Sequence, residues 1–142
     1  MPEINYPYTQ AYLPAPGGGL TPLLQVELFN GGQAAKAVGV VDSGSAITVF
    51  KPEHANLLGI QDVTNGDLQQ ISTQAGGLDC YVFDLEMQVE FGDNTIRFPC
   101  RVGFFAGNVP RNILGRNVLF QHFQIGFNDI AQEIYLRPED EN

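Results

Sequence analysis

Positive charge is scarce in this sequence of 142 residues, which has seven Lys and Arg residues against sixteen Asp and Glu residues and a formal net charge of −9. A surface of that sign repels nucleic-acid phosphates and anionic lipids, so we expect neither nucleic acid nor a membrane as a partner. No apolar run approaches the roughly 20 residues that span a bilayer, and the first residues lack the basic start and apolar stretch of a secretory signal. We therefore expect a cytoplasmic protein.

Chemically versatile side chains are also few, since the chain has two cysteines, Cys80 and Cys100, and two histidines, His54 and His122. The cysteines lack CxxC spacing, so a structural zinc site has no support, and we expect neither a metal nor an organic cofactor. Reduced thiols are favoured over a disulfide, which stays open. A thiol nucleophile with a histidine base has no local signature to support it. We expect His54 to be a solvated side chain on a surface helix and His122 to lie at a helix end, near the last carbonyls.

Glycine and proline are abundant by contrast, with 16 and 9 copies among 44% hydrophobic residues, a composition typical of one folded, turn-rich domain. Residues 1–22 hold five of the prolines and three successive glycines, which resist regular structure. We expect an N-terminal arm at 1–22, either loose or lying over the body or in the cleft. A folded domain at 23–137 and an acidic tail at 138–142 follow.

Alternation of apolar and polar residues predicts an all-β fold. Residues 23–30 form a first strand, and a turn at 30–32 leads to a return strand at 37–41, which is apolar on both faces and therefore expected to be buried. A second hairpin has arms at 71–74 and 81–91, and its glycine-containing tip comprises Ala75, Gly76, Gly77 and Leu78. The other expected elements are a strand at 47–50, a short helix at 52–59, a strand at 95–105, one or two helical turns at 118–122 and a last hairpin formed by 123–127 and 133–136.

A carboxylate, Asp42, ends the apolar strand at 37–41 and begins the tripeptide Asp42-Ser43-Gly44. Burial disfavours a charged carboxylate unless donors or another charge compensate, so this residue is the first candidate for a functional group. The alternative is an ordinary turn in which the aspartate accepts a hydrogen bond from its own backbone. The tripeptide alone does not decide between the two.

The order of motifs around Asp42 resembles the retropepsin branch of the aspartic proteases over roughly residues 23–127. The motifs are, in order, the Gly31-Gly32 turn, Asp42-Ser43-Gly44, Thr48-Val49, the Gly76-Gly77 hairpin and Ile113-Leu114-Gly115-Arg116-Asn117. The resemblance implies a single-domain retropepsin-like acid protease fold in which Asp42 is catalytic and residues 75–78 form a flap over a bound peptide. It further implies an active-site loop completed by Ser43, Gly44 and Ser45 and supported from below by Ile113, Leu114, Gly115 and Arg116.

Peptide hydrolysis by two carboxylates needs one that is ionised and one that is protonated, which follows when two aspartates lie about 3 Å apart. The chain has no second Asp-Ser-Gly or Asp-Thr-Gly tripeptide. We therefore expect a homodimer whose two-fold axis places two copies of Asp42 together, with the Ser43 hydroxyls helping to lock the two loops. The expected activity is that of an aspartic endopeptidase acting on peptide or protein substrates. The alternative is a non-catalytic, dimeric peptide-binding module.

Two positions depart from the retroviral pattern. Ser45 stands where alanine is common, and we expect its hydroxyl to lower the pKa of the Asp42 pair and to move the activity optimum to acid pH. Ala46 replaces an aspartate that would pair with Arg116, so the local partner of this arginine is open.

Acid pH also reduces repulsion between two subunits of charge −9, so dimers are expected to be scarce near neutrality. Residues expected to line apolar subsites around the cut bond are Ile47, Val49 and Val109.

Overall fold

The computed structural model describes residues 8–15, 17–73, 76–107, 109 and 111–139, and strands predominate in them. In chain order the strands are β1 (Tyr8–Ala11), β2 (Leu13–Pro14), β3 (Leu20–Thr21), β4 (Leu23–Asn30), β5 (Gln33–Val41), β6 (Val49–Phe50), β7 (Asp67–Thr73), β8 (Gly76–Phe91), β9 (Asn94–Phe105), β10 (Asn112–Leu114), β11 (Phe123–Asn128) and β12 (Glu133–Pro138). Three short helical elements are interspersed: α1 (Pro52–Leu57), η1 (Val63–Asn65) and α2 (Leu119–His122). The all-β prediction is confirmed.

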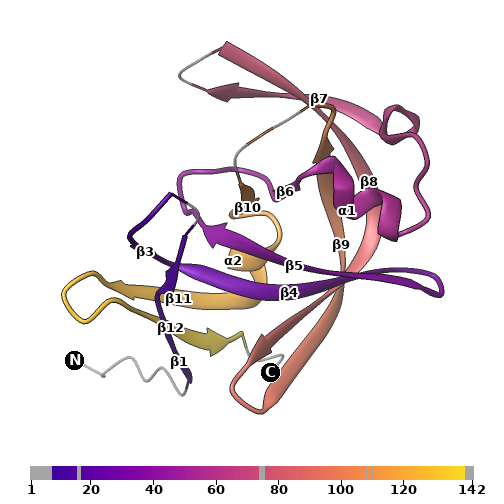
Figure 1. Cartoon of the computed structure of the whole chain (residues 1–142). Coiled ribbons are helices and arrows are strands. Elements are labelled where there is room, and N and C mark those ends of the chain that lie inside the picture. The colour runs from indigo at the N-terminus through magenta and orange to yellow at the C-terminus, as the bar shows by residue number, and fades with distance from the viewer. Residues whose placement is uncertain (1–7, 16, 74–75, 108, 110, 140–142) are drawn as a thin grey trace.

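The strands form one large sheet and two small ones. The large sheet has seven strands in the order β4-β5-β10-β6-β9-β8-β7, and because β8 also pairs with β4, the sheet folds back on itself. A three-stranded sheet has the order β1-β12-β11, and β2 pairs with β3. In the view of Figure 1, one end of the β7–β8 hairpin projects at the top, while β1, β11 and β12 lie in the lower half. The region where β10 enters the large sheet lies between these two ends.

The β4–β5 hairpin corrects one expectation about burial. The hairpin and its turn at Gly31 and Gly32 form as predicted, and Gly31 has the positive φ of 59° that such a turn requires. Strand β5 is not buried on both faces, however, because its side chains alternate between buried and more exposed positions. Val38 is 44% exposed, although it is apolar. Apolar residues on both faces of a strand therefore do not guarantee two covered faces.

The β7–β8 hairpin forms as predicted, but with longer arms and an earlier turn. Residues expected at the tip, Gly76, Gly77 and Leu78, belong to β8 and pair with Thr73, Ser72 and Ile71. Ala75, the fourth expected tip residue, lies outside the described residues. Glycine is thus tolerated within the paired arm.

The N-terminal segment is more regular than its composition predicts. Strand β1 pairs antiparallel with β12, as in the register pair of Thr9 with Tyr135. Tyr12 is 7% exposed, and its hydroxyl donates to Asp129 Oδ1 at 2.7 Å, a contact that raises the pKa of Tyr12 to about 12. The prediction that residues 1–22 lack regular structure is therefore wrong for the described part, because pairing with a distant strand satisfies its backbone groups.

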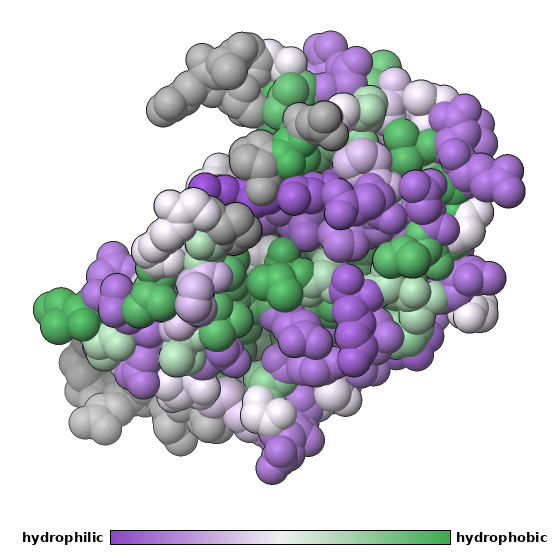
Figure 2. All heavy atoms as spheres, in the orientation of Figure 1, coloured by the Kyte–Doolittle hydropathy of each residue, from purple (hydrophilic) through white to green (hydrophobic). Residues whose placement is uncertain are grey.

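Most of the remaining elements are where local signals predict them. Helix α1 begins at Pro52, which suits the first helical position, and it buries Ala55 against the core. Strand β9, helix α2 and the β11–β12 hairpin also form, whereas the expected strand at 47–50 is regular only over β6. None of the described helices is long and apolar enough to span a membrane. On the face shown in Figure 2, hydrophobic side chains are interleaved with hydrophilic ones.

Candidate active site

Asp42 follows β5 directly and starts a loop that returns to the same sheet as β6. Strand β10 lies between these two strands, parallel to β5 and antiparallel to β6. The backbone N–H of Asp42 donates to the Leu114 carbonyl at 3.0 Å, which continues the β5–β10 ladder into the loop. The candidate catalytic residue is therefore fixed to two strands at the point where its loop begins.

The loop turns tightly around the Asp42 carboxylate. The Gly44 N–H donates to Asp42 Oδ1 at 2.8 Å, and the Ser45 N–H donates to the Asp42 carbonyl at 3.2 Å. A Cβ on Gly44 would lie 3.1 Å from Oδ1, so glycine lets the backbone approach the carboxylate. The ordinary turn that was the alternative interpretation of this tripeptide is thus present, with the aspartate accepting from its own backbone. It leaves Asp42 Oδ2 without a donor among the residues that the structure describes.

Ser45 does not act on Asp42 as the sequence led us to expect. Its hydroxyl donates to the Ile47 carbonyl at 2.8 Å, two residues further along the loop. A serine hydroxyl has one proton to donate, so this bond uses the donor that was expected to stabilise the Asp42 carboxylate. The expectation that Ser45 acts directly on the carboxylate pair has no support in this geometry, and Ser45 instead shapes the loop.

Thr48 connects the loop to the segment after β10, a role that the sequence pattern does not reveal. Its side chain is fully buried, and Oγ1 accepts hydrogen bonds from the Gly115 N–H at 3.0 Å and the Val118 N–H at 3.2 Å. Further along, the Arg116 N–H donates to the Ser45 carbonyl at 2.8 Å. The only sequence signal for this role is a hydroxyl within the otherwise apolar segment 47–50. Backbone contacts thus join residues 114–116 to the loop around Asp42.

Replacing Thr48 by Val is expected to lower the free energy of unfolding by about 2–4 kcal/mol, because two buried backbone donors lose their acceptor while the side-chain volume hardly changes. Chemical denaturation of the purified protein measures this change. Thr95, which is exposed at the start of β9, supplies the matched control. Thr95→Val is expected to change stability by less than about 0.5 kcal/mol. Equal effects of the two substitutions would contradict the role given to Thr48.

Arg116 is exposed and forms no ion pair with a carboxylate in the described part of the chain. It lines an open depression of about 410 Å³ together with Ser43 of the Asp42 loop. The other residues of this depression are Ala46, Asn117, Phe120 and Gln121. The side chain of Arg116 is therefore available to a group outside this copy of the chain, beside the loop that carries Asp42.

The expected apolar subsite residues divide into two kinds. Val49 is fully buried in a small cluster with Cys80, Val82 and Phe105, so it cannot line an open subsite and that expectation is wrong. Ile47 and Val109 are half-buried and pack against this cluster from outside. They present part of their surface to solvent near the loop. Gly77 and Leu78 of the hairpin are exposed as well.

The two cysteines are poor nucleophiles. Both are free and buried. Burial raises the pKa of the Cys80 thiol, and it raises that of Cys100 to about 12, so neither forms a thiolate readily. Among the described residues, no group of three or more His, Cys, Asp or Glu side chains is placed to hold a metal ion. His122 ends α2 as predicted and stacks on Phe98, with ring centroids 3.9 Å apart.

His54 is not the solvated side chain that its helix position predicts. Asn112, which is buried, donates from Nδ2 to the Val38 carbonyl and accepts at Oδ1 from the Lys51 N–H. These two backbone groups fix the orientation of the amide, so its second N–H points at His54 Nε2, 3.1 Å away, which must accept. His54 Nδ1 is buried without a partner. The site favours the neutral imidazole.

The stability of the protein is therefore expected to fall in mild acid. Burial lowers the pKa of His54 below its usual value, a shift that Lys51 reinforces and Glu53 opposes. Between this lowered pKa and about 6.5 the unfolded chain binds more protons, so the free energy of unfolding decreases as pH falls through that interval. Urea denaturation between pH 5 and 7.5 measures it. His54→Gln keeps a hydrogen-bond acceptor and removes the titrating group, so its free energy of unfolding should depend less on pH in this interval. An equal pH dependence in the variant and the wild type would contradict the assignment to His54.

The large sheet and the loop around Asp42 define a retropepsin-like fold, and comparison with solved structures supports it. A retropepsin-like aspartic protease from Rickettsia conorii matches with a TM-score of 0.54 and 14% identity over 90% of this chain and 88% of that one. EIAV protease in complex with the inhibitor HBY-793 matches with a TM-score of 0.42 and 20% identity over 71% of this chain and 86% of that one. The retroviral protease-like domain of Ddi1 from Leishmania major gives 0.44 and 18% over 87% and 100%.

No protein-family model matches the chain, and no curated protein matches it. The Rickettsia conorii structure is 14% identical to this chain, so its likeness shows the all-β, retropepsin-like fold and not the chemistry.

Proposed function

We propose that the protein is an aspartic endopeptidase whose catalytic group is Asp42. The observation that carries this proposal is the loop geometry: within a retropepsin-like fold, Asp42 is held to β10 by its backbone while Oδ2 is left without a donor from the described residues. A carboxylate with a fixed backbone and a free oxygen suits proton transfer to or from water.

The proposed reaction needs two such carboxylates. When two aspartates lie close together, repulsion keeps both from ionising, so one accepts a proton from the attacking water and the other donates to the peptide carbonyl. Residues 1–142 contain one Asp-Ser-Gly tripeptide and no Asp-Thr-Gly. The second carboxylate is therefore proposed to be Asp42 of a second copy, related by a two-fold axis.

Features around the loop support the proposed dimer and the binding of a peptide. Ser43 and Arg116 line the open depression beside Asp42, where a second copy would place its own loop. The β7–β8 hairpin projects from the body and carries exposed Gly77 and Leu78, which suits a flap that contacts an extended peptide. Half-buried Ile47 supports a preference for hydrophobic residues at the cut bond.

An acid optimum is part of the proposal for two reasons. A carboxylate pair that shares one proton has its active form between its two macroscopic pKa values. Protonation of surface carboxylates also lowers the repulsion between subunits that each carry a net charge of −9 near neutrality. The titration of His54 opposes this gain because it destabilises each subunit in mild acid.

Incubation of the purified protein with a mixed peptide library at pH values from about 3 to 7, followed by mass spectrometry, tests the proposal. The expected result is cleavage between hydrophobic residues that is strongest on the acid side of this range. Absence of cleavage at every pH, with a dimer confirmed by analytical ultracentrifugation, would favour a non-catalytic peptide-binding module.

A further inference from the structure

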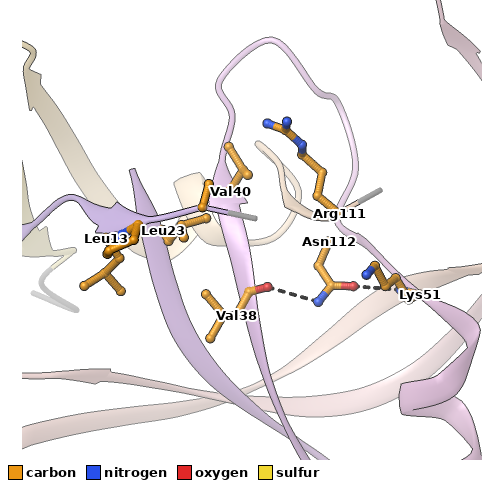
Figure 3. Close-up of a pocket in the computed structure, with 9 residues that line it drawn as sticks. Leu13, Leu23, Val38, Val40, Lys51, Arg111 and Asn112 are labelled. Carbon is orange, nitrogen blue, oxygen red and sulfur yellow. Dashed lines mark hydrogen bonds between the residues drawn. The ribbon is translucent and has the colours of Figure 1, made fainter. Parts of the chain in front are cut away.

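A cavity of about 470 Å³ lies beside the two strands that hold Asp42. Val38 and Val40 of β5 line one side, and Arg111 and Asn112 line another (Figure 3). Residues from three further segments complete the lining: Leu13, Pro14, Ala15, Leu23 and Lys51. A volume of this size is typical of a pocket for a small molecule or for one or two peptide residues.

The floor of the cavity is apolar and partly uncovered. Val38 is 44% exposed here, on the face of β5 that the sequence led us to expect to be buried. Val40 and Leu13 are half-buried. An apolar strand face that the chain leaves open, within a concave site, is suited to the methylene groups of a bound side chain.

The rim of the cavity is positively charged. Lys51 and Arg111 are two of the seven cationic residues in a chain of net charge −9, and both line this one site. Arg97 and Arg101 on β9, by comparison, are paired with carboxylates on β8 and β7. Neither Lys51 nor Arg111 forms an ion pair with a carboxylate in the described part of the chain. Two unpaired cations over an apolar floor are complementary to a group with a short apolar stem and a negative end.

The cavity is close to the proposed reaction centre along both strands. Val40 precedes Asp42 by two residues, and Arg111 precedes Leu114, which accepts the Asp42 N–H, by three. Figure 3 shows the Arg111 side chain reaching toward the Val40 side of the cavity, with the Asn112 amide held between the Val38 carbonyl and the Lys51 backbone. An extended peptide advances by about 3.3 Å per residue. A substrate residue a few positions from the cut bond can therefore reach this cavity while the cut bond lies at Asp42.

We propose that this cavity binds an Asp or Glu side chain of the peptide substrate. The carboxylate lies between Arg111 and Lys51, and its stem lies on Val38 and Val40. The inference rests on the proposed peptidase function and makes it more specific: the substrates are peptides that carry an acidic residue near, but not at, a hydrophobic cleavage site. Charge complementarity favours this occupant over a basic or neutral side chain.

Binding of fluorescent octapeptides to the Asp42→Asn protein tests the inference without cleavage. The peptides have an apolar centre and carry Glu or Gln at one flanking position at a time, and the measurement is made at pH 6, where Glu is ionised. At one position the Glu peptide is expected to bind on the order of tenfold more tightly than the Gln peptide, about 1.4 kcal/mol. Arg111→Gln combined with Lys51→Gln is expected to abolish this ratio.

A matched variant separates a specific contact from a general effect of charge. Arg97→Gln combined with Arg137→Gln removes two positive charges outside the cavity lining and is expected to leave the ratio unchanged. Denaturation curves of both double variants check that they fold. Equal affinity for Glu and Gln peptides at every position, or a ratio that falls equally in both double variants, would overturn the inference. The cavity would then belong to another occupant, such as the acidic C-terminal segment of the chain itself.

The same peptides given to the wild-type protein distinguish failure of the inference from failure of the proposed function. Cleavage without any difference between Glu and Gln, together with equal binding, would overturn the inference and leave the peptidase proposal standing. Binding that favours Glu through Arg111 and Lys51, without cleavage at any pH, would support the acidic peptide site and contradict the peptidase proposal.

Discussion

Asp42→Asn is expected to reduce peptide cleavage by at least about a thousandfold while the protein still folds, dimerises and binds peptide. The substituted amide can neither accept the proton of the attacking water nor share a proton with a partner carboxylate, so both proposed roles of the pair are lost. The shape of the side chain is unchanged, and its oxygen can still accept the Gly44 N–H that donates to Oδ1 at 2.8 Å. Initial rates of cleavage, measured by mass spectrometry on one optimised peptide, quantify the loss.

A surface carboxylate supplies the control for this substitution. Asp93 is exposed in the turn between β8 and β9, and Asp93→Asn removes the same charge. Its expected activity is within about twofold of the wild type. If Asp42→Asn retained the full rate, the assigned chemistry would be wrong. If it retained a biological effect although cleavage was lost, the binding-module interpretation would be favoured.

Gly115→Ala is expected to destabilise the protein by about 3 kcal/mol or more and to abolish cleavage with it. A Cβ at this position would lie 2.7 Å from the Ile47 carbonyl carbon and 2.8 Å from the Ser45 oxygen. Both are backbone atoms of the Asp42 loop, so the clash cannot be relieved by a side-chain rotation. Either the loop or the segment after β10 must move, and the contacts of Thr48 with Gly115 would be broken.

Urea denaturation measures the stability of this variant, with Gly32→Ala as its control. Gly32 lies in the β4–β5 turn, and a Cβ there would meet no atom within 4 Å. The change in its free energy of unfolding is expected to stay within about 1 kcal/mol. Wild-type stability in Gly115→Ala would contradict the close packing of the loop against the segment that follows β10.

Local signals in the sequence account for much of the fold and for the position of the site. The turn at Gly31 and the start of α1 at Pro52 are set by the backbone preferences of those residues, which act whatever the rest of the chain does. Asp42 stands out because a carboxylate ends an apolar strand, and the structure places it at the start of a tightly bonded loop. These features depend on neighbours within a few residues.

Features that depend on distant partners could not be predicted in the same way. Strand β1 forms because it pairs with β12, which lies more than 100 residues later in the sequence, and no local pattern predicts that pairing. His54 contacts Asn112, which is 58 residues away in the sequence. Its position on a helix therefore led to the wrong expectation of a solvated side chain. The exposure of Val38 depends on which elements cover β5, and composition cannot show that. The partner of the Ser45 hydroxyl, by contrast, is the nearby Ile47 carbonyl, but the residue pattern alone does not distinguish this acceptor from the Asp42 carboxylate.

The most direct test of a shared active site is the activity of wild-type protein to which Asp42→Asn protein is added. If each site needs one Asp42 from each of two copies, mixed dimers are inactive. With free exchange at concentrations where dimers predominate, an equal amount of the variant should lower the activity of a fixed amount of wild type to about half, and a threefold excess to about a quarter. Activity that is unchanged by the variant would show that one copy of Asp42 suffices, and would contradict the account.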